Sequence, residues 1–129
     1  MKILIIEDNS QNRYLETFLL EKRGHQVVQA ATGPEGIQMA SRVQPELILL
    51  DIQLPVMDGY AVAHALRQNP VLRAVPIVAV TSYAMVGDRE RVMAAGCTGY
   101  IEKPINPDTF VSEIEQYLNA RQPGGGDPS

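Results

Sequence analysis

The sequence has very little cysteine, few aromatic residues and no long apolar run. Cys97 is the single cysteine in 129 residues, so neither an intrachain disulfide nor a cysteine-based zinc site is expected. Tryptophan is absent and aromatic residues make up 5% of the chain, which predicts an aliphatic core. No stretch approaches the roughly 20 apolar residues of a membrane-spanning helix, and the N-terminus has no signal-peptide pattern. We therefore expect a cytoplasmic protein without membrane contact.

The length and the charge balance are those of one ordinary globular domain. A chain of 129 residues has the commonest size for a single domain. The formal net charge of −4 argues against non-specific attraction to nucleic acid or anionic membranes. We expect a folded domain over residues 1–120, followed by a flexible tail over residues 121–129, which contain a Pro-Gly-Gly-Gly run.

A short apolar run that ends in Asp51 is the centre of the sequence. Residues 47–50 are four aliphatic residues in a row, too few for a helix, and they predict a strand buried on both faces. Asp51 follows at the carboxyl end of that strand, which is where ligands bind in open α/β sheets. A lone aspartate after a strand is more often a loop starter or a helix cap, but three further stretches argue against that interpretation.

Each of these stretches is another short apolar run that ends in a polar side chain. The polar residues that follow them are Glu7 and Asp8, Thr81, and Lys103. If the strands are parallel, all of these side chains meet Asp51 at one edge of the sheet. Two carboxylates about 4 Å apart repel by about 4 kcal/mol at an effective dielectric near 20, so three carboxylates need compensation. Lys103 and a divalent cation would supply it, and carboxylate oxygens suit Mg²⁺.

Helical patterns alternate with the apolar runs. The predicted strands cover about residues 2–6, 27–28, 47–50, 77–81 and 99–101, and the predicted helices about residues 10–23, 32–43, 60–68, 86–95 and 107–118. In the first helix Tyr14, Leu15, Phe18 and Leu19 fall on one face, which we expect to be buried. The alternation predicts a doubly wound α/β fold with right-handed crossovers and a parallel sheet.

Over about residues 1–120 the chain resembles a response-regulator receiver domain, the CheY-like phosphoacceptor module of two-component signalling. The residues that carry the resemblance are Glu7-Asp8, Asp51 with Leu54-Pro55 and Asp58-Gly59, Thr81, and Lys103-Pro104. Each motif is weak alone, but their order along the chain is specific. The resemblance implies a flavodoxin-like (βα)5 fold with a five-stranded sheet in the order 2-1-3-4-5, which puts Asp8 and Asp51 on adjacent strands.

The resemblance also implies a role for each carboxylate. Asp51 would be the nucleophile that becomes phosphorylated. Asp8 would bind Mg²⁺ directly, Glu7 would act mainly through a bound water, and the backbone carbonyl of Gln53 would complete the protein ligands. The domain would promote its own phosphorylation and dephosphorylation and would not be an enzyme in the usual sense.

Lys103 and Thr81 are implied to hold the phosphoryl oxygens. Phosphoryl transfer needs positioning and charge neutralisation more than covalent chemistry, and an ammonium and a hydroxyl provide both. The resemblance names Thr81 and Tyr100 as a switch, in which Thr81 moves toward the phosphoryl group and the Tyr100 ring turns inward. A partner protein would then dock on the fourth helix, the fifth strand and the last helix. The peptide bond between Lys103 and Pro104 is implied to be cis.

Two segments, residues 7–13 and 81–88, are most similar to DivK-type single-domain regulators. Receivers attached to hybrid histidine kinases share much of this pattern, so a receiver excised from a hybrid kinase or a multidomain regulator stays open as an alternative to a stand-alone regulator. The phosphodonor would be a histidine kinase or a histidine phosphotransfer protein. We find no helix-turn-helix segment, so we expect no direct binding of nucleic acid, and we expect a monomer or a weak dimer.

Two rival interpretations are weaker. A haloacid-dehalogenase-type enzyme usually has a second aspartate two residues after its nucleophile, where this chain has Gln53. A degenerate receiver that only binds partners would lack some of the five chemical positions, and all five are filled.

The sequence also carries a prediction about the lifetime of the phosphoryl group. Gln53 and Tyr83 stand two residues beyond Asp51 and Thr81 and neither is a carboxylate, which predicts a long-lived phosphoryl group.

Overall fold

Five strands alternate with five α-helices in the residues that the computed structural model describes, 1–82 and 86–121. The strands are β1 Lys2–Ile6, β2 Gln26–Ala30, β3 Leu47–Asp51, β4 Ile77–Thr81 and β5 Gly99–Glu102. The helices are α1 Ser10–Lys22, α2 Gly33–Val43, α3 Gly59–Arg67, α4 Val86–Ala94 and α5 Phe110–Arg121, with a short 3-10 helix η1 Pro70–Leu72 before β4. Tyr83 and residues 122–129 of the predicted tail lie outside the described residues.

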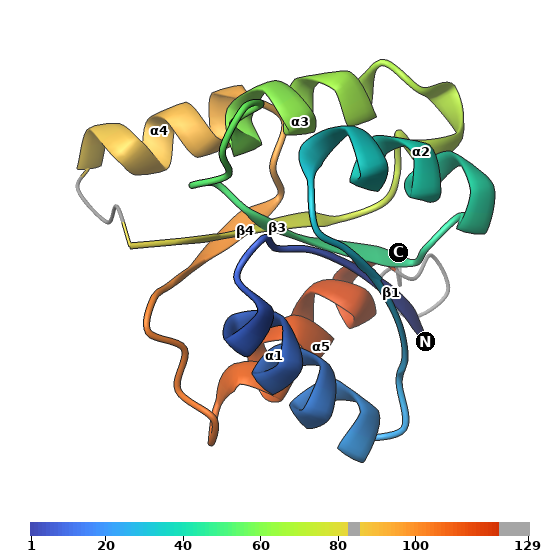
Figure 1. Cartoon of the computed structure of the whole chain (residues 1–129), viewed down its shortest axis with the longest axis vertical. Helices are drawn as coiled ribbons and strands as arrows, with labels where there is room; N and C mark the ends of the chain where they lie inside the picture. Colours follow the sequence, from blue (N-terminus) through green and yellow to red (C-terminus); the bar gives the residue numbers. More distant parts are fainter. Residues whose placement is uncertain (83–85, 122–129) are drawn as a thin grey trace.

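The strands form one parallel sheet in the order β2-β1-β3-β4-β5. The predicted fold class and strand order are therefore confirmed. Figure 1 shows α1 and α5 together on one face of the sheet, and α2, α3 and α4 on the other face. No helix among residues 1–82 and 86–121 is long and apolar enough to span a membrane.

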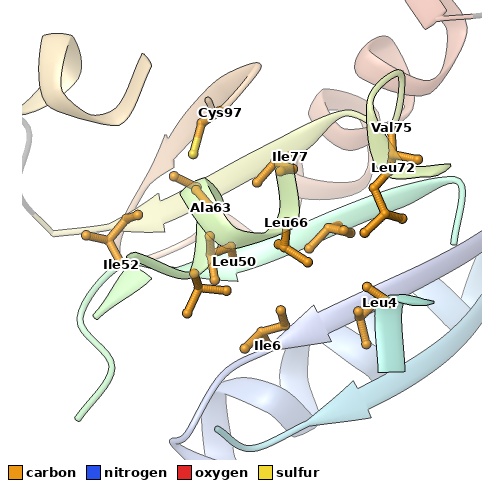
Figure 2. Packing of buried hydrophobic residues seen from close by; sticks show 14 of the residues in the cluster. Leu4, Ile6, Leu50, Ile52, Ala63, Leu66, Leu72, Val75, Ile77 and Cys97 are labelled. Atoms are coloured by element: carbon orange, nitrogen blue, oxygen red, sulfur yellow. The ribbon is translucent and has the colours of Figure 1, made fainter. Parts of the chain in front are cut away.

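The core has two halves, one on each face of the sheet, because successive side chains of a strand point to opposite faces. In β1, Leu4 and Ile6 pack toward α2 and α3, whereas Ile3 and Ile5 pack toward α1 and α5. Figure 2 shows the first of these halves, with Leu66 of α3 lying over the strand residues. A strand that is buried on both faces reads as a continuous apolar run, and for this reason the sequence pattern located these strands.

Cys97 packs at the edge of the same half of the core and is 5% exposed. Burial raises the pKa of its thiol to about 11, although the neighbouring Arg67 acts in the opposite direction. The thiol is therefore protonated at neutral pH, and Cys97 is a packing residue.

The predicted buried face of α1 is wrong. Tyr14 and Phe18 are 70% and 50% exposed, and their rings stack on each other at a centroid distance of 6.3 Å. The buried positions are Glu16 and Leu20, one turn apart, while Leu15 and Leu19 are partly buried at the border. The helix is therefore rotated about its axis so that a glutamate, and not an aromatic residue, faces the sheet.

Polar residues after the strands begin the helices and thereby shape the loops at the carboxyl edge. The Asn9 side chain accepts a hydrogen bond from the Asn12 N–H at 2.9 Å, which starts α1 directly after Glu7 and Asp8. Asp58 caps α3 in the same way through the Ala61 N–H at 3.0 Å. These caps end the loops after β1 and β3 within a few residues of the acidic side chains.

Candidate functional site

The register of the sheet brings the acidic residues of β1 and β3 to the same level. Ile6, the last residue of β1, is paired with Leu50 of β3. Glu7 and Asp51 each follow these paired residues by one position, so they lie side by side at the carboxyl edge. On the other side, β4 and β5 end at the paired Thr81 and Glu102, immediately before Lys103.

Asp51 is buried and bonded to Lys103. Asp51 is the last residue of β3, a strand in which all five residues are buried, and it is 3% exposed. The Asp51 Oδ1 atom accepts hydrogen bonds from the Lys103 ammonium at 3.0 Å and from the Gln53 N–H at 3.0 Å. The backbone N–H of Lys103 donates a hydrogen bond to the Thr81 carbonyl at 2.8 Å. The Lys103–Pro104 peptide bond is cis, as predicted.

The charge of Lys103 is stabilised by the carboxylates around it. Burial by itself lowers the pKa of this ammonium, but its hydrogen bond and charge interaction with Asp51, followed by Glu7 and Glu16, outweigh burial and raise the pKa. Lys103 is therefore protonated, and it reaches Asp51 from the position directly after β5.

Glu7 is buried and Asp8 is exposed, although they are neighbours in the chain. Glu7 Oε2 accepts a hydrogen bond from the Asn9 N–H at 3.1 Å, and Glu7 Oε1 lies 3.7 Å from the Lys103 ammonium without a hydrogen bond from any described residue. Burial and, next, the charge of Asp51 raise the pKa of Glu7 to about 7, while the Asn9 contact and Lys103 lower it. The acidic edge is thus short of positive charge.

The three carboxylates are arranged as ligands for one divalent cation. One oxygen each of Glu7, Asp8 and Asp51 lies within 4.8 Å of the other two. An octahedral Mg²⁺ shell at 2.0–2.1 Å places its ligand oxygens about 3 to 4.2 Å apart, so small movements of side chains would complete it. The donor set is all oxygen, and the unbonded Oε1 of Glu7 is a free acceptor inside it. These residues fit Mg²⁺.

Gln53 connects the two loops that flank Asp51, a contact that the sequence pattern did not reveal. The Gln53 side-chain carbonyl accepts hydrogen bonds from the Ser82 N–H at 3.0 Å and from the Ser82 hydroxyl at 2.8 Å. Its backbone N–H is bonded to Asp51, so the residue is positioned beside the carboxylate. The backbone carbonyl of Gln53 stays a predicted metal ligand.

Thr81 and Tyr100 lie on the neighbouring strands β4 and β5. Thr81 is 1% exposed, and Tyr100 is half-buried. The Tyr100 hydroxyl accepts hydrogen bonds from Nε and Nη2 of Arg89, a residue of α4, at 3.2 and 2.8 Å. Arg89 was missed in the sequence because only the fold brings α4 against β5.

Glu16 is the second residue that the sequence reasoning missed. It is 2% exposed, and its Oε1 atom has no hydrogen-bond partner among the described residues. Burial and, next, the charge of Glu7 raise the pKa of its carboxyl to about 8, whereas Lys103 lowers it. Its spacing of four residues before the apolar Leu20 was the available signal, because both positions fall on one helical face.

Comparisons with known proteins agree with this geometry. The family model described as the response regulator receiver domain matches residues 3–115. The polar-differentiation response regulator DivK of Brucella ovis is 40% identical over 116 residues, which are 90% of this chain and 94% of DivK.

Two solved structures are also similar. The chemotaxis response regulator CheY4 of Vibrio cholerae superposes with a TM-score of 0.86 at 28% identity, covering 90% of this chain and 97% of CheY4. The receiver domain of a sensor histidine kinase from Pseudomonas aeruginosa, whose structure has a magnesium ion in the active site cleft, has a TM-score of 0.83 at 33% identity over 91% of this chain and 96% of its own. Sequence and fold together show that the chain belongs to the response regulator receiver domain family, the CheY-like signalling domains of two-component systems.

Proposed function

We propose that the chain is a phosphorylation switch in which Asp51 accepts a phosphoryl group from a phosphohistidine of a histidine kinase or a histidine phosphotransfer protein. The observation that carries the proposal is the buried Asp51 carboxylate with the Lys103 ammonium 3.0 Å away and the carboxylates of Glu7 and Asp8 beside it. A buried nucleophile with a cation already in place is the arrangement that phosphoryl transfer needs.

In the proposed step an oxygen of Asp51 attacks the phosphorus in line with the leaving imidazole nitrogen. The new O–P bond forms as the N–P bond of the donor breaks, and the donor histidine is released. Lys103 neutralises one oxygen of the transferred group, and the Thr81 hydroxyl hydrogen-bonds to another. Mg²⁺, when held by Glu7, Asp8, Asp51 and the Gln53 carbonyl, would supply further charge neutralisation.

The output of the switch would depend on Thr81 and Tyr100. Tyr100 is held by Arg89 of α4, so a change in the Tyr100 side chain would be transmitted to that helix. Phosphorylation must favour the active state by roughly 3–5 kcal/mol to convert a mostly inactive population into a mostly active one. A partner protein would read the change on the face formed by α4, β5 and α5.

The extent of the protein and its assembly are also part of the proposal. The receiver would cover residues 1–120 and act as a DivK-like stand-alone regulator, monomeric or weakly dimeric. The similarity to the receiver of a sensor histidine kinase keeps the alternative, a receiver excised from a larger kinase. Finding this coding sequence fused to a kinase or an output domain would decide for the alternative.

Labelling with acetyl phosphate and Mg²⁺ tests the phosphoacceptor directly. Intact-mass measurement is expected to show one added phosphoryl group on the wild type and none on Asp51→Asn. Asp108→Asn, at an exposed aspartate in the turn before α5, is the matched control and should be labelled normally. Normal labelling of Asp51→Asn would disprove the site. The label should persist well beyond a few seconds, because Gln53 is not a carboxylate that activates water.

A second experiment tests the switch. NMR or crystallography of the beryllofluoride complex with Mg²⁺ is expected to show the Tyr100 ring turned inward and the bond to Arg89 broken. An unchanged Tyr100 rotamer together with an unchanged position of α4 would show that this pair is not the output device.

A further inference from the structure

A cavity of about 370 Å³ lies beside the acidic edge, between α1 and the segment after β5. Leu15 and Glu16 line it from α1, Ser82 follows β4, and Lys103, Pro104 and Ile105 line it from the other side. Its volume is that of a site for a small organic molecule. The acidic cluster of Glu7, Asp8 and Asp51 is a separate feature, and none of its three residues lines this cavity.

Glu16 is the unusual group in the cavity wall. It is 2% exposed, its Oε1 atom has no hydrogen-bond partner, and no basic side chain among residues 1–82 and 86–119 forms an ion pair with it. Buried carboxyl groups are normally paired or fully hydrogen-bonded. The two described ion pairs of Lys103 are with Asp51 and Glu7, so Lys103 does not fill this role.

A carboxyl group is unusual at this position of the helix. Glu16 lies one turn before Leu20 on the face of α1 that packs on the sheet, where an apolar side chain would be expected. The remaining wall is mainly apolar, contributed by Leu15, Pro104 and Ile105. A ligand with an apolar body packed against this wall and a charged head bound to Glu16 would match both the apolar wall and the unpartnered carboxyl group.

The charges select the sign of the ligand. Glu16 has Glu7 and Asp51 as neighbouring acids, and Lys103, the one basic residue of the wall, is already shared between Glu7 and Asp51. An anion would meet this acidic surrounding with no free basic group among the wall residues. A cation would instead pair with a carboxylate that lacks a partner.

We propose that this cavity is a binding site for a small organic cation, with an amidinium, guanidinium or primary ammonium head on Glu16 and a short apolar body against Leu15 and Ile105. An amidinium or guanidinium is favoured because two parallel N–H donors match the two oxygens of a carboxylate. The site does not depend on phosphorylation, so its failure would leave the proposed role of Asp51 untouched, and the reverse also holds.

Benzamidine is the probe, and benzamide is its neutral counterpart of nearly the same shape. Both are titrated into the ¹⁵N-labelled protein with saturating Mg²⁺ at pH 8, where more of Glu16 is ionised than at pH 7. Benzamidine is expected to shift the amide signals around residues 15–16 and 103–105 in a saturable manner. Benzamide is expected to bind at least tenfold more weakly.

Glu16→Gln removes the charge and keeps the shape, and it should weaken benzamidine binding at least tenfold. Glu21→Gln, an exposed glutamate on the same helix, is the matched control and should bind as the wild type does. Glu16→Leu is a second variant that fills the position with an apolar side chain; it is expected to fold, to melt at a higher temperature and to bind no benzamidine.

Three results would overturn the proposal. Equal affinity of benzamidine for the wild type and Glu16→Gln would show that Glu16 is not the counter-ion. Equal affinity of benzamide and benzamidine would show an apolar pocket without charge selection. Benzamidine binding that is present in EDTA and lost in saturating Mg²⁺ would place the probe on the acidic cluster instead of in the cavity.

Discussion

Replacement of Asp8 by asparagine should invert the stability order of the two proteins when Mg²⁺ is added. Asp8 contributes one of three carboxylates whose oxygens lie within 4.8 Å of one another, with Lys103 as the nearby cation. Asp8→Asn keeps the size of the side chain and removes one negative charge. The change therefore relieves repulsion in the metal-free protein and removes a charged ligand from the metal-bound protein.

The metal-free gain can be bounded from the geometry. Two unit charges 4.8 Å apart repel by about 3.5 kcal/mol at an effective dielectric of 20 and about 0.9 kcal/mol at 80. Asp8 is exposed, so the lower figure applies to its repulsion from each of the two other carboxylates, Glu7 and Asp51, and the lost attraction to Lys103 offsets part of the summed gain. We expect Asp8→Asn to be more stable than the wild type by about 1 kcal/mol without metal, which raises Tm by roughly 4 °C.

The effect of Mg²⁺ follows from mass action. At a concentration one hundred times its Kd, Mg²⁺ should stabilise the wild type by about 2.7 kcal/mol. If the loss of a direct ligand weakens binding about a hundredfold, the same concentration stabilises Asp8→Asn by about 0.4 kcal/mol. The wild type should then be the more stable protein by roughly 1 kcal/mol.

Urea unfolding of both proteins in EDTA and in Mg²⁺ measures all four free energies. Asp108→Asn serves as the control, and it should follow the wild type in both conditions. A wild-type Mg²⁺ titration that Asp8→Asn leaves unchanged would refute the assignment of this cluster as the metal site. A metal-free destabilisation by Asp8→Asn would refute the reasoning about repulsion.

Three further predictions concern other parts of the molecule. Lys103→Ala should lower the free energy of unfolding of the metal-free protein by about 2 kcal/mol, because the 3%-exposed Asp51 loses its ion-pair partner. The affinity for Mg²⁺ should stay unchanged. Equal urea midpoints for the two proteins would contradict this prediction. Burial raises the pKa of Glu16 from 4.5 to about 8, so the native state binds more protons than the unfolded state in this interval. The stability should therefore fall by roughly 3 to 4 kcal/mol between pH 5 and pH 8 in EDTA, with a smaller slope in Glu16→Gln. Identical slopes for the two proteins would be the adverse result. Val56 has φ 68° and a fully exposed side chain, and this backbone conformation is costly for a β-branched residue. Val56→Asn should therefore raise the free energy of unfolding by about 1 kcal/mol, measured by urea unfolding. Val71→Asn, at an exposed valine without positive φ, should show no such gain.

The sequence by itself determined the fold and most of the candidate site. Strands of a parallel sheet are buried on both faces, so the four apolar runs could be recognised without knowledge of their neighbours. Parallel strands also place all of their carboxyl ends at one edge, and therefore Glu7, Asp51 and Lys103 could be assigned to one place. A helix cap such as Asp58, which accepts a hydrogen bond from the Ala61 N–H, is likewise a local feature, since it depends on residues only three positions apart.

The tertiary structure alone decided which face of α1 is buried. The apolar residues of this helix cover a stripe that includes Tyr14 and Leu15 as well as Leu20, and periodicity does not specify how such a broad stripe is rotated against the sheet. The packing of the helix against β1 and α5 sets this rotation, which exposes Tyr14 and buries Glu16.

Contacts between distant segments were likewise beyond the sequence. Gln53 and Ser82 are 29 residues apart, and Arg89 and Tyr100 belong to a helix and a strand whose separation depends on the whole fold. A hydrogen bond between side chains depends on positions within a few tenths of an ångström, whereas apolar burial depends only on which face a residue occupies. The sequence therefore determined the edge where the chemistry would take place, and the folded structure decided which polar neighbours and which cavity surround it.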